Sequence, residues 1–145
     1  MIEHTTAAAE FGATLGAYLV GHHVADYWVQ TDHQAQHKGL PGWAGRISCA
    51  SHVLTYTLTL VVCLAAVTWW LRLPVSPAWA ATGLGVSAAT HYWADRRSTL
   101  MWLADRLSKG GFYRRGEGLA SGAAHLDQSW HWLWLGIAAL VTVGH

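Results

Sequence analysis

Three pairs of histidine and aspartate, each four residues apart, lie within otherwise apolar stretches of this 145-residue chain: His22–Asp26, His91–Asp95 and Asp127–His131. On an α-helix this spacing places both side chains on one face, about one turn apart. A carboxylate inside a membrane helix costs roughly 2.5–3.5 kcal/mol on insertion scales. Because the chain accepts this cost three times, always beside a histidine, the pattern predicts one polar site inside a helical membrane protein.

Four apolar segments are each close to the roughly 20 residues that cross about 30 Å of hydrocarbon, namely 11–30, 47–71, 77–94 and 119–143. Only 12% of the residues are charged, about half the soluble average, while 52% are hydrophobic. We therefore predict an all-α fold, an antiparallel bundle of four transmembrane helices, with residues 1–145 forming a single integral membrane domain. A soluble bundle with a polar core is the alternative. The second segment argues against it, because His52 is its one strongly polar residue.

Lysine and arginine are strongly segregated between the loops. Eight of the nine lie after the first and third segments, and Arg72 alone lies on the other side. The positive-inside rule then places both termini outside the inner membrane and the basic loops in the cytoplasm. With this orientation the polar groups of all four segments share one depth, most of them within about 15 Å of the cytoplasmic boundary.

The loop between the third and fourth segments, residues 98–118, has a pattern of its own. Leu100, Leu103 and Leu107 recur at helical spacing among charged residues. We expect a short amphipathic helix on the inner membrane surface, ending at Gly110–Gly111. Anchoring to anionic lipid is its ordinary role.

Imidazole and carboxylate together suit a divalent transition metal, with zinc first and iron or manganese as alternatives. The seven candidate ligands are His22, Asp26, His52, His91, Asp95, Asp127 and His131. One zinc ion needs only three or four ligands. The set therefore suits either two ions or one ion whose ligands are oriented by the remaining residues. Two other interpretations stay open: a hydrogen-bonded network that only holds the bundle together, and a proton or ion pathway.

Further polar residues extend this constellation toward the cytoplasm. Gln30, His33 and His37 continue the face of Asp26, and we interpret the two histidines as a solvated extension. His23 points about 100° away from His22, so only one of the two easily faces the site. The residues expected to contact a substrate with an anionic head group are Gln30, Lys38, Arg96, Arg97 and Gln128.

Four motifs occur in an order that resembles the DUF3307 family of small bacterial and phage membrane proteins. They are residues 22–32 (HHVADYWVQTD) with Lys38, then His52-Val53-Leu54, residues 91–95 (HYWAD) and residues 126–131 (LDQSWH). The resemblance covers nearly the whole chain. It implies a four-helix membrane fold and favours His22 over His23, but it implies no particular activity. Arg96-Arg97 follow the third motif here.

We expect a metal-dependent hydrolase that acts on a lipid or other phosphoester near the cytoplasmic leaflet, with Asp26 or Asp127 as the catalytic base. The expected partners are the lipid bilayer and an anionic lipid head group. Nucleic acid is not expected, and a homo-oligomer is left open. The alternatives are a transporter or channel for protons or metal ions and a non-catalytic membrane interaction protein. The outer halves of the segments, nearly free of ionisable groups, count against a transport path.

Overall fold

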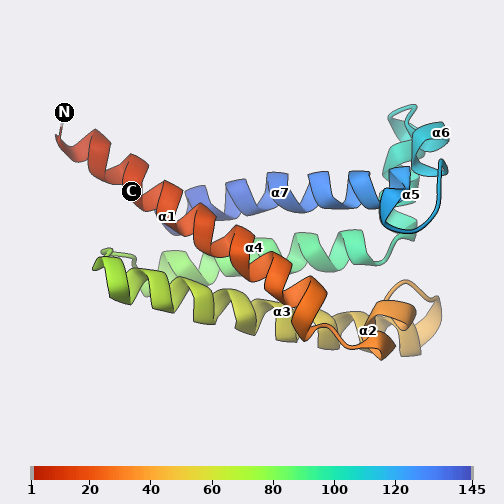
Figure 1. Ribbon diagram of the computed structural model, residues 1–145, viewed down its shortest axis with the longest axis horizontal. Coiled ribbons are helices and arrows are strands. Elements are labelled where there is room, and N and C mark those ends of the chain that lie inside the picture. The colour runs from red at the N-terminus through yellow and green to blue at the C-terminus, as the bar shows by residue number, and fades with distance from the viewer. Residues whose placement is uncertain (1, 145) are drawn as a thin grey trace.

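The computed structural model describes residues 2–144, with side chains described from Thr6 onward, and contains no strand in that range (Figure 1). The predicted all-α class is therefore confirmed for the described residues. The helices are α1 (Ile2–Val24), the π-helix η1 (Ala25–Val29), α2 (Asp32–His37), α3 (Gly42–Leu71), α4 (Pro77–Asp95), α5 (Ser98–Arg106), α6 (Gly110–Tyr113), the 3₁₀ turn η2 (Gly118–Ala120) and α7 (Gly122–Thr142).

The four long helices form a ring in which each one packs against two neighbours. Helix α1 contacts α3 and α7, and α4 contacts α3 and α7 on the other side. The chain ends and the α3–α4 connection lie at one end of the ring (Figure 1). Helices α2, α5 and α6 lie at the opposite end, which therefore carries the basic loops.

Local signals account for where the long helices begin and end. Helix α3 ends at Leu71, as predicted, because Arg72 takes a left-handed conformation with φ 55°. Helix α4 begins with Pro77, whose missing N–H costs nothing in the first turn. Helix α7 begins at Gly122, after the predicted 119, because the Ser121 side chain caps it by accepting a hydrogen bond from the N–H of Ala124.

One helix in the described part of the chain, α3, is long and apolar enough to cross a membrane. It has 30 residues, and its most apolar window reaches a mean hydropathy of 1.8. By length and composition, the structure thus supports membrane association through this one helix.

A short amphipathic helix does occupy the loop between α4 and α7. Helix α5 buries Leu100 and Ala104 and exposes Trp102. The predicted stop at Gly110–Gly111 was wrong, because α5 ends at Arg106 and Gly110 begins α6. The earlier stop follows from Ser108, which has φ 58° and turns the chain out of the helix.

The half of the bundle nearest the chain ends is packed mainly with apolar side chains. Its buried cluster includes Leu60, Leu64 and Leu135. Helices α4 and α7 approach closely at Gly83, where an added Cβ would lie 2.6 Å from the carbonyl oxygen of Ala138. Small residues at such crossings are typical of helix packing in membranes.

Candidate metal centre

A π-helical turn at the end of α1 shapes one side of the site. The N–H of Gln30 donates to the carbonyl of Ala25, five residues back, at 2.8 Å. Single π turns inside helices are frequent at functional sites. The chain then leaves the helix, and a capping box between Thr31 and Gln34 starts α2. Asp26 consequently lies on a turn of its own, with its side chain only 12% exposed.

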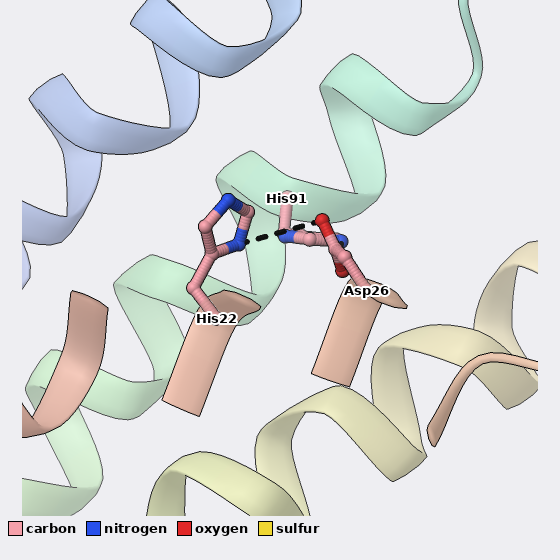
Figure 2. Close-up of side chains that lie close together, drawn as sticks. All are labelled: His22, Asp26 and His91. Carbon is pink, nitrogen blue, oxygen red and sulfur yellow. Dashed lines mark ion pairs between the residues drawn. The ribbon is translucent and has the colours of Figure 1, made fainter. Parts of the chain in front are cut away.

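All seven candidate ligands from the sequence come together between the four long helices. Each of these helices contributes one histidine, and none of the four imidazoles is more than 3% exposed. Figure 2 shows His22 and Asp26, from the first helical segment, turned toward His91 on α4. The groups within reach of a common ion are His22–Asp26–His91, His52–His91–Asp95 and Asp95–Asp127–His131.

The donor atoms of the central group, His52, His91 and Asp95, lie close enough together to hold a metal ion. His52 Nε2 lies 3.1 Å from His91 Nε2. Asp95 Oδ2 lies 3.3 Å from the first of these nitrogens and 3.2 Å from the second. Donors on one tetrahedral zinc lie about 3.3–3.5 Å apart, since each bond is about 2.0–2.2 Å long. Asp26 Oδ1 follows at 3.3 Å from His52 Nε2 and 3.7 Å from His91 Nε2.

Two carboxylate oxygens in this group are buried without a hydrogen-bond partner in the protein. They are Asp26 Oδ1 and Asp95 Oδ2, the atoms closest to the two imidazole nitrogens. Buried polar atoms are nearly always satisfied, so such a pair calls for an explanation. A cation held by the two imidazoles and Asp95 Oδ2 would satisfy that oxygen directly and would place a positive charge beside Asp26 Oδ1.

The outer members of the cluster are held more loosely. His22 Nδ1 is 3.5 Å from Asp26 Oδ2, and His22 Nε2 is 3.3 Å from Gln128 Oε1. His131 Nε2 is 3.5 Å from Asp127 Oδ1 and 4.0 Å from Asp95 Oδ1. These distances suit His22 and His131 as side chains that orient the central carboxylates. They suit these two histidines less well as ligands that bind an ion directly.

A lysine completes the charge distribution of the cluster. Lys38 Nζ lies 2.9 Å from Asp95 Oδ1, with its side chain 12% exposed. With neutral imidazoles, the three aspartates and this ammonium carry a formal charge of −2. A divalent cation would balance that charge, and a charge left unbalanced in a buried site is costly.

A cavity of about 540 Å³ borders the cluster at the basic end of the bundle. Asp26, Asp95 and Asp127 form part of its wall. The other polar side chains of the lining are Tyr27, Gln30, Lys38, Arg97, Tyr113, Ser121, His125 and Gln128. Leu100 and Leu119 add apolar surface, so the cavity combines hydrogen-bond donors, cations and hydrocarbon.

Some residues singled out in the sequence lie elsewhere. Arg96 donates to the carbonyls of Lys38 and Leu40 and does not line the cavity, whereas Arg97 does. His23 turns away from the cluster and pairs with the carbonyl of Leu19, so His22 is the member of that pair that faces the site.

The two histidines expected as a solvated extension lie on α2, beyond the cluster. The rings of His33 and His37 stack on each other with centroids 4.1 Å apart. The break at Gln30 separates them from the face of Asp26.

Two neighbours of the site were not among the predicted site residues. Tyr56 stacks on His91 with ring centroids 3.8 Å apart, and its hydroxyl lies 2.7 Å from Ser87 Oγ. Both stand four residues from a cluster histidine, Tyr56 after His52 and Ser87 before His91. The same spacing that identified the pairs could have found them.

Comparison with known proteins gives no match to a family model, a curated protein or a solved structure. What the fold and the site define is therefore a helical protein with one helix able to cross a membrane and a buried His/Asp cluster able to hold a metal ion.

Proposed function

We propose that this protein is a four-span membrane metalloprotein that hydrolyses an anionic amphiphile, such as a lipid phosphoester, at the cytoplasmic leaflet. The central His52–His91–Asp95 group carries the proposal, because its donor separations of 3.1–3.3 Å match one bound ion.

Exposed tryptophans support a membrane-spanning bundle. Trp69 and Trp70 are 67% and 75% exposed at one end of α3, and Trp43 is 75% exposed at the other. Trp43 and Trp69 are separated by about 39 Å along the helix, close to the distance between the two interfaces of a bilayer. Tryptophan favours those interfaces. The exposed surface of α3 between them includes Leu54, Leu58 and Val62.

The other three long helices are less apolar than α3 because they carry most of the polar residues of the site, whereas α3 contributes His52. The polar side chains that lower their hydropathy include His22, His91 and His131, which are buried against one another rather than exposed. Intramembrane ionisable groups characteristically face a bundle interior in this way. The motif order, which resembles that of the DUF3307 family, favours the same four-span interpretation.

Two serines at opposite ends of the bundle test this topology. Ser108 lies between α5 and α6, Ser76 precedes α4, and both are exposed. In intact cells, a Ser76→Cys variant should react with an impermeant thiol reagent, and a Ser108→Cys variant only after permeabilisation. The reverse pattern, or equal labelling of both, would overturn the proposed orientation. The native Cys49 and Cys63 are replaced in both proteins to remove background.

We infer a single ion at the centre, zinc first and iron or manganese next. His52, His91 and Asp95 would hold it, and Lys38 Nζ already lies 2.9 Å from the second oxygen of Asp95. A second ion on that oxygen would have to displace this ammonium. The single-ion arrangement therefore fits the charge of the cluster better than a pair of ions.

Asp26 is the proposed catalytic base. It borders the cavity, lies next to both ligand imidazoles, and has its other oxygen oriented by His22. A bound divalent ion lowers the pKa of its water toward 7. Asp26 would accept a proton from a water molecule activated at this site, and Asp127, also in the cavity wall, would return a proton to the leaving group.

The cavity fits an amphiphilic phosphoester. Lys38 and Arg97 supply positive charge for the head group, with Gln30 and Gln128 as further donors. Leu100 and Leu119 offer apolar contact to the chain that follows the head group. Arg96 takes no part, since its guanidinium holds the α2–α3 loop.

Metal analysis of protein purified without added metal is the first test, with about one transition-metal ion per chain expected. Hydrolysis is then assayed on phosphatidic acid in mixed micelles, before and after chelation. His52→Ala should lose the metal, whereas Asp26→Asn should keep metal but lose hydrolysis, with the exposed Asp32→Asn as control. Absence of metal, with no thermal stabilisation on adding zinc, iron or manganese, would refute the metal site. Metal without hydrolysis would refute only the enzymatic part.

A further inference from the structure

The imidazole of His91 has an aromatic ring stacked on each of its two faces. The ring of Tyr56 on α3 stacks on it with centroids 3.8 Å apart and an interplanar angle of 28°. The ring of His131 on α7 stacks on it with centroids 4.2 Å apart and the same angle. Two rings at these distances would overlap if they shared one face of an imidazole, so they lie on opposite faces. His91 is therefore the middle ring of a stack that joins α3, α4 and α7.

The second ring nitrogen of His91 lacks the protein contact that commonly orients a metal-binding histidine. Such a histidine nearly always donates its other ring N–H to a carboxylate, a backbone carbonyl or water. His91 Nδ1 is buried and has no hydrogen-bond partner among the described residues. His37 Nδ1, by contrast, lies 2.8 Å from the carbonyl oxygen of His33. The protein therefore orients the plane of the His91 ring through its two faces rather than through Nδ1.

Tyr56 is itself held firmly in place. It is only 1% exposed, and its hydroxyl lies 2.7 Å from Ser87 Oγ. Ser87 stands about one turn before His91 on α4, and Tyr56 stands about one turn after His52 on α3. The hydroxyl pair thus connects the same two helices whose imidazole nitrogens meet at 3.1 Å. With its ring packed and its hydroxyl paired, Tyr56 has little freedom to leave the face of His91.

We propose that Tyr56 is a positioning residue of the metal centre, holding His91 in its binding orientation by stacking on the imidazole. The inference rests on the metal site of the proposed function but not on hydrolysis or on the membrane topology. Tyr56 does not bind the ion, because its hydroxyl pairs with Ser87. A group that is already fixed in its bound orientation loses less rotational freedom on binding, which increases affinity.

Zinc affinity separates the role of the ring from that of the hydroxyl. The purified full-length protein, freed of metal by chelation, is titrated with zinc in competition with a fluorescent zinc chelator. Tyr56→Leu removes the ring, and affinity should fall about tenfold, the lower end for residues that orient a ligand. Tyr56→Phe keeps the ring, and affinity should stay within about twofold of the unmodified protein. An equal loss in both variants would assign the effect to the hydroxyl pair and overturn the proposal.

Leu60→Ala is the matched control for general loosening of the bundle. Leu60 is fully buried and lies about one turn beyond Tyr56 on α3. Its truncation removes packing but no stacked ring, so the folded protein should bind zinc like the unmodified protein. Melting temperatures establish that every variant is folded during the titration. A loss of zinc affinity in Leu60→Ala as large as that in Tyr56→Leu would contradict a specific role for the tyrosine.

NMR spectra of the histidine side chains in the zinc-free protein test the stack independently of the metal. Rings on both faces shift the carbon-bound ring protons of His91 upfield, and a His91→Ala variant identifies these signals. Tyr56→Leu should move them downfield, whereas Tyr56→Phe should not. Unchanged signals in Tyr56→Leu would show that the rings do not stack.

The two measurements also separate this inference from the proposed function. Normal zinc affinity in Tyr56→Leu would refute the positioning role and leave the metal centre intact. An unmodified protein that bound no zinc would refute the metal centre and, with it, the positioning role, while the NMR spectra would still show whether the stack exists.

Discussion

The two halves of the bundle are built from the same four helices but filled in opposite ways. Toward the chain ends, the interior is mostly Leu60, Leu64, Leu135 and alanine, with a few paired hydroxyls. Toward the basic loops, it holds four histidines and three aspartates. Apolar packing stabilises a fold without removing charged groups from water, whereas a buried carboxylate loses hydration free energy even when it is paired. The comparison indicates that the first half contributes most of the apolar packing, whereas the second half holds the buried groups that could bind a metal ion.

Asp95→Asn is expected to have the largest effect on the polar half. Asparagine keeps the volume but removes the charge from the carboxylate that contacts His52, His91 and Lys38. Metal affinity should fall about 100-fold or more, because a lost ligand costs at least as much as a lost orienting partner. Metal content and melting temperature are measured on the same preparations.

The control for this variant is Asp32→Asn, at an exposed position on α2. It should bind metal normally. If Asp95→Asn also kept its metal and melted at an equal or higher temperature, the cluster would be a packing device, and the two halves would not differ in role.

Leu60→Ala tests the apolar half and is expected to be the next largest effect. Leu60 is fully buried between the helices, so truncation leaves a cavity. Unfolding should become easier by about 2 kcal/mol, the lower end for such substitutions, because detergent hydrocarbon solvates the exposed side chain in the unfolded state. Metal affinity of the folded protein should not change.

Leu58→Ala, two residues away and 55% exposed, provides the matched control and should leave stability nearly unchanged. A Leu60→Ala protein that lost its metal without losing stability would contradict the division of roles between the halves. Denaturant titration in detergent, followed by tryptophan fluorescence, measures the free energy of unfolding of both variants.

Much of the helical pattern could be predicted from the sequence, because the length of an apolar segment and the residues that begin or end a helix are local properties. Pro77 and Arg72 lie where α4 begins and α3 ends, and the ends at 71 and 77 agree with the structure. The stop at Ser108 could not be predicted, since a left-handed serine has no strong signature beside a following glycine pair.

The convergence of the seven candidate ligands follows from their shared depth and spacing. Which of them lie at the centre of the cluster and which lie at its edge does not follow from the sequence. Sequence spacing treats His22 and His52 alike, and only tertiary packing brings His52 within 3.1 Å of His91 while His22 meets Gln128. The position of Lys38 on Asp95 likewise depends on the π turn and the break at Gln30, which redirect the chain after α1. Glu10, Thr14 and Tyr18 are four residues apart in the sequence, but their burial follows only from the tertiary packing.

The smallest effect on stability is expected from Asp105→Asn, which removes a charge on the surface, outside the interior of either half of the bundle. Asp105 accepts two hydrogen bonds from Arg114 at 2.6 and 2.8 Å on the exposed end of the bundle. Arg114 holds the pKa of the Asp105 carboxyl below its ordinary value. A depressed carboxyl pKa contributes stability above the unfolded value of about 4 and loses it as the pH falls through the folded pKa.

Solvent and salt screen an exposed pair, so the contribution is small at any pH. The variant should therefore melt only slightly below the unmodified protein at pH 7, and the difference should shrink as the pH is lowered toward 3 or as salt is added. Metal content should be identical in both. A loss of stability comparable to that of Leu60→Ala would mean that the basic end, rather than the apolar half, holds the bundle together, and the comparison would have to be reversed.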